Sequence, residues 1–115
     1  MSTIRIAGAP ITWGVCEVPG WGHQMGPDRV LTEMSALGLE AMEFGIPGFL
    51  PEDAEGRKAT LAKHNMSAVG GFFPVVLHDP GFDPLPSIAT ELDAYVAADA
   101  EVLVLAAETG LEGYD

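Results

Sequence analysis

Two glutamates stand where apolar segments end, Glu43 in Met42-Glu43-Phe44-Gly45 and Glu108 in Ala107-Glu108-Thr109-Gly110. A carboxylate at such a position can accept hydrogen bonds from substrate hydroxyls, bind a metal or act as a base. The structural alternative is a solvated carboxylate, or one bonded to backbone N–H groups of the next loop. Two such residues together predict a site for a polyol.

Two tryptophans lie in glycine- and proline-rich sequence after the first apolar segment. Trp13 stands in Gly8-Ala9-Pro10-Ile11-Thr12-Trp13-Gly14, and Trp21 in Pro19-Gly20-Trp21-Gly22-His23. An indole ring beside a site can stack on the apolar face of a sugar or cyclitol ring. The alternative for both is packing that closes the loop, and Trp13 is the stronger candidate for substrate contact.

His78 follows another apolar segment in Val76-Leu77-His78-Asp79-Pro80. An imidazole there can bind metal or transfer protons, although an isolated loop histidine is more often simply exposed. His23 and His64 are weaker candidates, and no two histidines have the spacing of a local metal motif. His78 is therefore kept as a candidate, with exposure as its alternative.

The charge of the chain limits its partners. Five basic residues stand against seventeen acidic ones among 115 residues, a formal net charge of −12. Nucleic acid and anionic membrane surfaces would be repelled. The sequence also has no glycine-rich dinucleotide motif and no Walker motif. None of the five basic residues lies in the segments that follow the carboxyl ends of the predicted strands, since Arg5 begins the first strand and the other four lie on predicted helices. These features favour a small uncharged substrate.

The single cysteine, Cys16, excludes an internal disulfide, as is usual in a reducing cytosol. We interpret it as a small packed side chain rather than a nucleophile. The N-terminus lacks the pattern of a signal peptide, and no apolar run approaches the roughly 20 residues that cross a bilayer. The sequence predicts a cytoplasmic protein without membrane contact.

The candidate residues are positioned by alternating strands and helices. Strands are predicted at Ile4–Ala9, Glu40–Gly45, Met66–Leu77 and Glu101–Ala107. Helices are predicted at Pro27–Leu37, at Pro51–His64 and from Pro84 or Pro86 onward. The first should bury Val30, Leu31, Met34 and Leu37, and the third Leu85, Ile88, Leu92, Tyr95 and Val96.

This order predicts an α/β fold with right-handed crossovers around a parallel sheet, in one domain over residues 1–115. The strands are apolar almost throughout, which is typical of strands covered on both faces. A flavodoxin-like doubly wound sheet can be complete at this length, whereas a (β/α)8 barrel would be half built. In either fold, functional residues lie where the carboxyl ends of the strands open into loops.

Three segments, Ile6–Gly14, Gly38–Gly45 and Gly48–Pro51, resemble the xylose-isomerase-like superfamily of sugar isomerases and epimerases, and within it the inosose dehydratases. The resemblance covers the whole chain as the N-terminal half of a (β/α)8 barrel, with strands 1–4 and helices 1–3. It implies an enzyme that uses Mn, Mg or Co to assist removal of a proton beside a carbonyl, giving isomerisation, epimerisation or dehydration.

The resemblance also assigns roles to residues. In the superfamily that the chain resembles, the metal ligands and catalytic groups lie at the ends of strands five to eight. The resemblance therefore implies none of them in this half. The matching positions Trp13, Glu43, His78 and Glu108 are implied to contact a sugar, cyclitol or other polyol.

Two functions follow as hypotheses. The first is the N-terminal fragment of an inosose dehydratase-like enzyme, which we expect to be inactive as 115 residues alone. The abrupt end at Leu111–Asp115 favours truncation. The second is a non-catalytic half-barrel that binds a partner or a second copy of itself through exposed strand edges.

Overall fold

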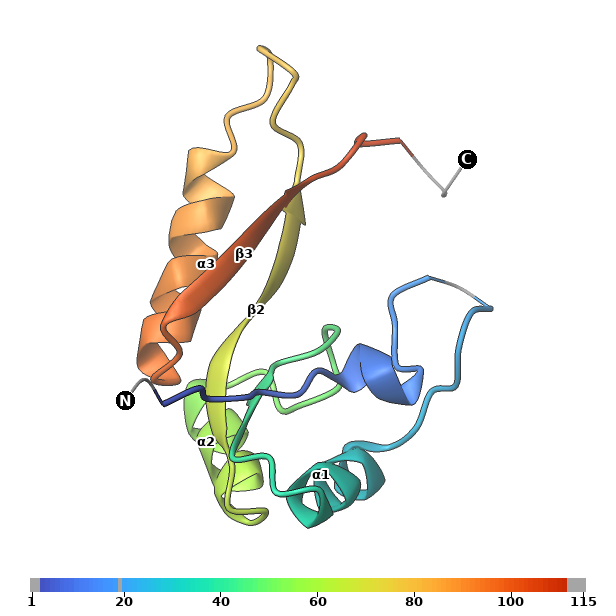
Figure 1. Cartoon of the computed structure of the whole chain (residues 1–115). Helices are drawn as coiled ribbons and strands as arrows, with labels where there is room; N and C mark the ends of the chain where they lie inside the picture. The colour runs from blue at the N-terminus through green and yellow to red at the C-terminus, as the bar shows by residue number, and fades with distance from the viewer. Residues whose placement is uncertain (1–2, 19, 112–115) are drawn as a thin grey trace.

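The computed structural model describes residues 3–18 and 20–111. Helices and strands alternate along this part of the chain (Figure 1). In order they are the 3-10 helix η1 (Pro10–Trp13), α1 (Pro27–Ala36), β1 (Ala41–Glu43), α2 (Ala54–Ala62), β2 (Ser67–Val75), α3 (Leu85–Ala97) and β3 (Val102–Ala107). The α/β class and the helix predicted for each connection are confirmed, with ends that differ by a few residues.

The three strands form one parallel sheet in the order β1-β2-β3. This order follows the chain without the reversal that defines a doubly wound sheet. Right-handed crossovers that all proceed in one direction place their helices on one face, and α2 packs against both β2 and α3. The described strands therefore wind as consecutive (β/α) units, and their sheet is open rather than closed into a barrel.

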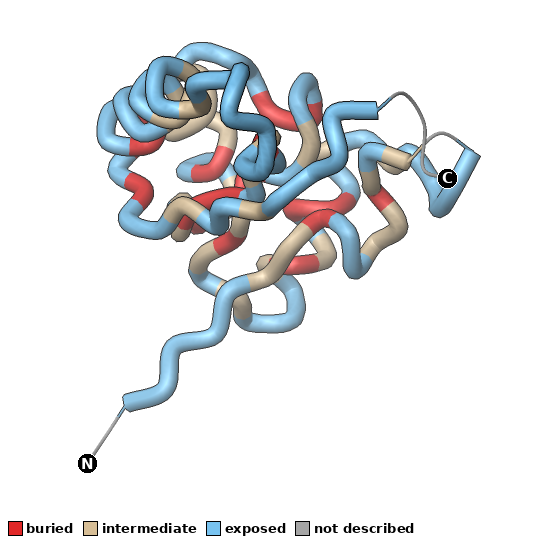
Figure 2. Tube along the Cα trace, turned by 90° about the horizontal axis from the view of Figure 1, so that it is seen from above, coloured by how far each residue is buried: buried red, intermediate tan, exposed pale blue. Residues whose placement is uncertain are grey.

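The first predicted strand, Ile4–Ala9, is not formed as a strand. Only Gly8 makes a bridge, parallel to Met42 of β1. Before it, the side chains of Ile4 and Ile6 are 86% and 70% exposed, and this end of the chain runs out from the body as a tail (Figure 2). Gly8 exchanges two backbone hydrogen bonds with β1, from its N–H to the Ala41 carbonyl and from the Glu43 N–H to its own carbonyl, whereas residues 4–7 pair with no strand in the described part of the chain.

Helix α1 buries most of the predicted stripe. Pro27 takes the first turn, where its missing N–H removes no hydrogen bond. Three residues of the stripe are buried: Val30, Leu31 and Met34. Leu37 was expected to join them, but it lies past the last helical residue and is 71% exposed.

Helix α2 begins three residues later than predicted because Asp53 caps it. The Asp53 carboxylate accepts a hydrogen bond from the Gly56 N–H at 2.7 Å. An aspartate in this position satisfies a backbone donor that the first turn leaves free. Leu61 then anchors the helix in the core.

The core lies between the helices and one face of the sheet. Met42 and Phe44 enter it from β1 and the residue after the strand's end. The Phe44 ring meets Tyr95 of α3 edge to face, with 5.1 Å between ring centres, and the Arg57 guanidinium of α2 lies 4.7 Å from the Phe44 ring centre. One aromatic ring thus joins β1 to two helices.

Helix α3 buries a narrower face than predicted. Tyr95 is buried and Ile88 is half-buried. The other three residues of the expected stripe are exposed, Leu85 by 68%, Leu92 by 43% and Val96 by 72%. This helix is apolar on more than one side, and the sheet and α2 cover only one of them.

The face of the sheet away from the helices is open, which corrects the prediction that both faces are covered. Phe72 of β2 is 51% exposed, and Val102 and Val104 of β3 are 48% and 41% exposed. Phe72 is in register with Val104, and in a parallel ladder such partners lie on the same face. The apolar strand sequence therefore reflects a sheet whose second face has no cover among the described residues.

Candidate functional site

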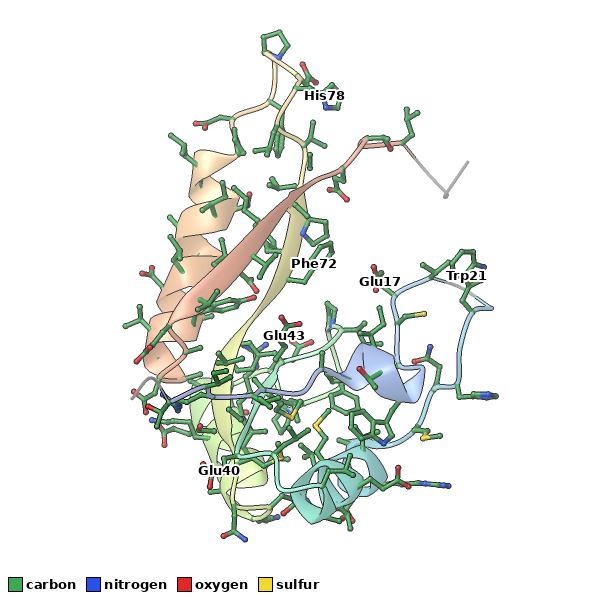
Figure 3. The ribbon with its side chains drawn as sticks, viewed as in Figure 1. Glu17, Trp21, Glu40, Glu43, Phe72 and His78 are labelled. Carbon is green, nitrogen blue, oxygen red and sulfur yellow. The ribbon has the colours of Figure 1, made fainter. Side chains whose placement is uncertain are left out.

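Glu43, the last residue of β1, lies on the open face. Its neighbours Met42 and Phe44 are both buried against the helices, and side chains alternate between the faces of a strand. The Glu43 side chain is half-buried and lies on the side of β2 that faces the first loop (Figure 3). This placement at a carboxyl strand end agrees with the prediction from the sequence.

A break in strand register accompanies Glu43. Met42 pairs with Ala68, but Glu43 pairs with Gly70, so β2 carries one extra residue at this point. Such bulges redirect side chains and are common beside functional sites. Because the partner in register is a glycine, no β2 side chain covers the Glu43 carboxylate from that position.

Phe72 lies two residues beyond Gly70 toward the carboxyl end of β2, on the same face as Glu43. Figure 3 shows the ring on the side of β2 that faces the first loop, above Glu43. An aromatic ring half exposed in the middle of a strand presents apolar surface that a ligand or another segment can cover. The open face therefore combines a carboxylate with an aromatic ring.

Glu108 directly follows β3, as predicted. Its N–H donates to the Val75 carbonyl at 3.1 Å, so the backbone continues the ladder for one residue. Strand alternation then places the Glu108 side chain on the same face as Phe72, and it is exposed. Glu43 and Glu108 thus stand at the carboxyl ends of the two outer strands, with β2 between them.

His78 is not brought near Glu43. It lies in the loop after β2 with an exposed side chain, at the far tip of the molecule in Figure 3. This is the alternative that the sequence left open for an isolated loop histidine. A role for His78 in binding stays a prediction.

Trp13 is anchored in the structure by a hydrogen bond. Its indole N–H donates to Glu33 Oε2 of α1 at 2.6 Å, and Arg29 Nε donates to the other oxygen of the same carboxylate at 3.1 Å. The hydrogen bond from Arg29 has the larger effect and that from Trp13 the smaller, and both hold the pKa of Glu33 below its ordinary value. The Trp13 ring is half-buried against the core, so packing accounts for much of its surface, and substrate contact stays a prediction.

The remaining candidates of the first loop are more exposed. Trp21 is 68% exposed and lies at the outer end of the loop (Figure 3). Cys16 Sγ lies 3.7 Å from the Trp21 carbonyl oxygen, in keeping with the packing interpretation. Glu17 projects from the loop toward the open side in the same view. Where the loop closes, His23 N–H donates to Gly14 O at 2.9 Å.

The described residues do not assemble a metal site. Among them, no three histidine, cysteine, aspartate or glutamate side chains gather closely enough to hold an ion. A catalytic divalent ion needs several such donors. The metal that the resemblance implies would need ligands from outside this part of the chain, and it stays a prediction.

A hollow of about 530 Å³ lies at the opposite end of the sheet. It is lined by residues at the amino ends of β1 and β2 and by residues that precede the strands, among them Arg5, Glu40, Asp99 and Glu101. Functional groups of parallel α/β folds gather at the carboxyl ends of the strands instead. The site is therefore assigned to Glu43 and its neighbours rather than to this hollow.

Tyr95, behind the sheet, provides a pH-dependent test of the core. Burial, followed by the nearby Glu91 carboxylate, raises its pKa to about 12. The fold favours the neutral phenol of Tyr95, whereas the phenol of the unfolded chain titrates near pH 10. The stability that the neutral phenol contributes is therefore fully present below pH 10 and is lost as pH rises toward 12. We expect the free energy of unfolding to fall by about 2 kcal/mol more over that interval in the wild type than in Tyr95→Phe. Denaturant unfolding at stepped pH measures this, and parallel curves would contradict it.

No family model matches the chain. Among curated proteins, it is similar to the inosose dehydratase of Geobacillus kaustophilus strain HTA426, with 32% identity over 79 residues. The match supports a distant relationship between the two sequences. Those 79 residues are 69% of this chain and 25% of the relative, so the chain spans about a quarter of the length of the protein it matches.

The helices of the structure were compared with the length and hydropathy of a membrane-spanning helix. Among the helices of residues 3–18 and 20–111, none combines the length and the apolar sequence that crossing a bilayer requires. The cytoplasmic location stays a prediction.

Two features of the site were missed from the sequence. The apolar pattern of Met66–Leu77 does not distinguish Phe72 from its neighbours, and it does not show that Gly70 lies beside Glu43. The paired glycines Gly70-Gly71 were the available signal, because glycine inside a strand marks a bulge or a close approach. A Cβ on Gly71 would overlap the Tyr95 hydroxyl, which explains the second glycine.

Proposed function

We propose that this chain forms the first (β/α) units of a sugar- or cyclitol-modifying enzyme of the inosose dehydratase type. In this proposal the carboxyl end of the sheet supplies one wall of the substrate pocket, with Glu43 as its principal polar group. The observation that carries the proposal is the half-buried Glu43 carboxylate on the open face, beside a register break that leaves it uncovered. The relationship to inosose dehydratase supports the substrate class.

The contributions of the residues differ. Glu43 accepts hydrogen bonds from substrate hydroxyls, and Glu108 does so from the other outer strand. Trp13 and His78 contribute only if the first loop and the loop after β2 move toward the substrate. A divalent metal, if one is used, takes its ligands from later strands, and the reaction begins with proton removal beside a carbonyl.

The 115 residues alone are expected to bind substrate weakly and not to dehydrate it. The described residues hold one side of the pocket and no cluster of metal donors. An open half-pocket gives few simultaneous contacts, so its affinity should lie in the millimolar range or weaker. Appreciable turnover of inosose by the isolated chain would contradict this division of roles.

Glu43→Gln tests the proposal directly. We expect titration with inosose to shift the amide resonances of Glu43, Phe44 and Gly70, and Glu43→Gln to weaken binding about tenfold, because a hydrogen bond to a charged acceptor is lost. Nitrogen-15 NMR titration of the labelled chain measures both effects.

The matched control is Glu40→Gln. Glu40 is exposed and lies just before β1, toward the opposite end of the strand (Figure 3), so its substitution should leave binding unchanged. Glucose 6-phosphate should not bind, because the site has no basic residue and the chain carries a charge of −12. Equal loss in both variants, or preference for the phosphate, would refute the proposal.

A second candidate function is self-association through β3. The strand Val102–Ala107 carries no charge, proline or bulge, and it is paired only with β2 among the described strands. Val102, Val104 and Leu105 are each more than 40% exposed. An unprotected apolar edge of this kind is prone to pair with another strand.

The charges that flank β3 make this candidate testable. If two copies pair antiparallel about a two-fold axis centred between Val104 and Leu105, Glu101 of one faces Glu108 of the other, and like charges directly opposite weaken such a pair. Glu101→Lys should therefore tighten the dimer about tenfold or more, because it replaces two repulsive pairs by attractive ones. Sedimentation velocity measures the change, with Glu52→Lys as control for net charge. An equal effect of both variants would eliminate this pairing.

A further inference from the structure

We propose that Phe72 is the platform on which a neutral cyclic polyol stacks, with the Glu43 carboxylate accepting hydroxyl hydrogen bonds at the edge of the ring. This inference rests on the proposed function, and it assigns to Phe72 the recognition of a cyclic polyol by its ring. Neither residue alone defines a site. Glu43 and Phe72 lie on the same face of the sheet, and Gly70 stands in register with Glu43.

The first step is the common face. Glu43 is in register with Gly70, and Phe72 is two residues further along the same strand. Residues two apart on a strand share a face, so Glu43 and Phe72 both project away from the helices. Figure 3 shows both on the side of β2 that faces the first loop.

The second step is the spacing. Two residues along a strand and one strand across separate two Cα atoms by about 8 Å. The position of β2 directly in register with Glu43 is Gly70, which has no side chain to occupy that interval. At that position of β2, no side chain separates a six-membered ring lying on Phe72 from the Glu43 carboxylate, to which the ring can direct a hydroxyl.

The third step is the chemistry of the ligand. An aromatic face favours the C–H face of a sugar or cyclitol ring, and a carboxylate favours hydroxyl donors. The apolar neighbours Val102 and Val104 add surface for C–H groups but no polar partner. Anionic ligands are disfavoured, because the nearest charge is itself negative. A neutral ring with hydroxyls at its edge meets all of these conditions.

Phe72→Leu and Phe72→Trp test the platform, with inosose as the probe. Phe72 is half exposed, so neither variant should disturb folding, which circular dichroism checks. A ring stacked on an aromatic face has its C–H proton resonances shifted upfield. We expect this shift in the wild type and in Phe72→Trp, its loss in Phe72→Leu, and binding up to about tenfold weaker in Phe72→Leu.

Phe82→Leu is the matched control. Phe82 is 44% exposed but lies in the loop between β2 and α3, so both the ligand shift and the affinity should be unchanged. Inosose binding that depends on Glu43 but is equal in the wild type and Phe72→Leu would overturn this inference and leave the proposed function intact. Absence of any Glu43-dependent binding would overturn the proposed function, and the platform with it.

Discussion

Leu31→Ala is expected to destabilise the protein by about 2–5 kcal/mol, the range for removing a fully buried leucine side chain. Leu31 is 0% exposed and belongs to the cluster that joins α1 to β1 and α2. A sheet covered on one face gives a domain of this size a small reserve of stability, since typical domains have only about 5–15 kcal/mol. We therefore expect Leu31→Ala to be largely unfolded at room temperature. Chemical denaturation followed by circular dichroism measures the loss.

Leu37→Ala is the matched control for this prediction. Both leucines belong to the predicted stripe of α1, but Leu37 is 71% exposed just beyond the helix. Its substitution should change the free energy of unfolding by no more than about 0.5 kcal/mol. Comparable losses in the two variants would mean that the helix buries a different face from the one described.

This contrast between two leucines shows how far periodicity predicts burial. The spacing of apolar residues placed each helix correctly, and it identified Leu31 and Tyr95 as buried. It did not distinguish Leu37, Leu92 and Val96, which share the spacing but are left exposed by the elements of residues 3–18 and 20–111. Periodicity records which residues can be buried in some fold, whereas burial itself depends on what packs against them.

The strands show the same limit. Val102–Ala107 is apolar throughout and Ile4–Ala9 is apolar apart from Arg5, yet the first forms a strand and the second makes one bridge. Strand formation requires a partner along its whole length, and that information is not local. The parallel order of β1, β2 and β3 followed from the intervening helices, which is why it could be predicted.

For the candidate site, residue type and position at a strand end were sufficient to predict that Glu43 and Glu108 stand at the carboxyl end of the sheet. The relation of Glu43 to Phe72 was not predictable, because it depends on the register shift opposite Gly70. A one-residue shift moves a side chain to the other face of a strand. Sequence alternation alone could not show which face Phe72 would take.

Gly70→Ala is expected to have the other large effect. A Cβ on Gly70 would overlap the Val102 carbonyl oxygen and lie 2.7 Å from the Val102 carbonyl carbon. These are backbone atoms of β3, so no side-chain rotation can relieve the overlap, and β2 and β3 must separate at the point where their pairing begins. We expect a loss of about 3 kcal/mol or more, with fast hydrogen exchange at the amides of β3 while those of α1 stay protected longer.

Gly26→Ala separates this clash from the general effect of replacing glycine. Gly26 has φ −67°, and a Cβ there would meet nothing within 4 Å. Its substitution should therefore cost no more than about 1 kcal/mol, the typical effect of alanine at a helix N-cap. If the β3 amides of Gly70→Ala kept their protection against hydrogen exchange, β2 and β3 would be able to separate slightly without losing their pairing. The bulge at Glu43 would then not depend on glycine, and the close approach of β2 to β3 would have to come from the extra residue itself.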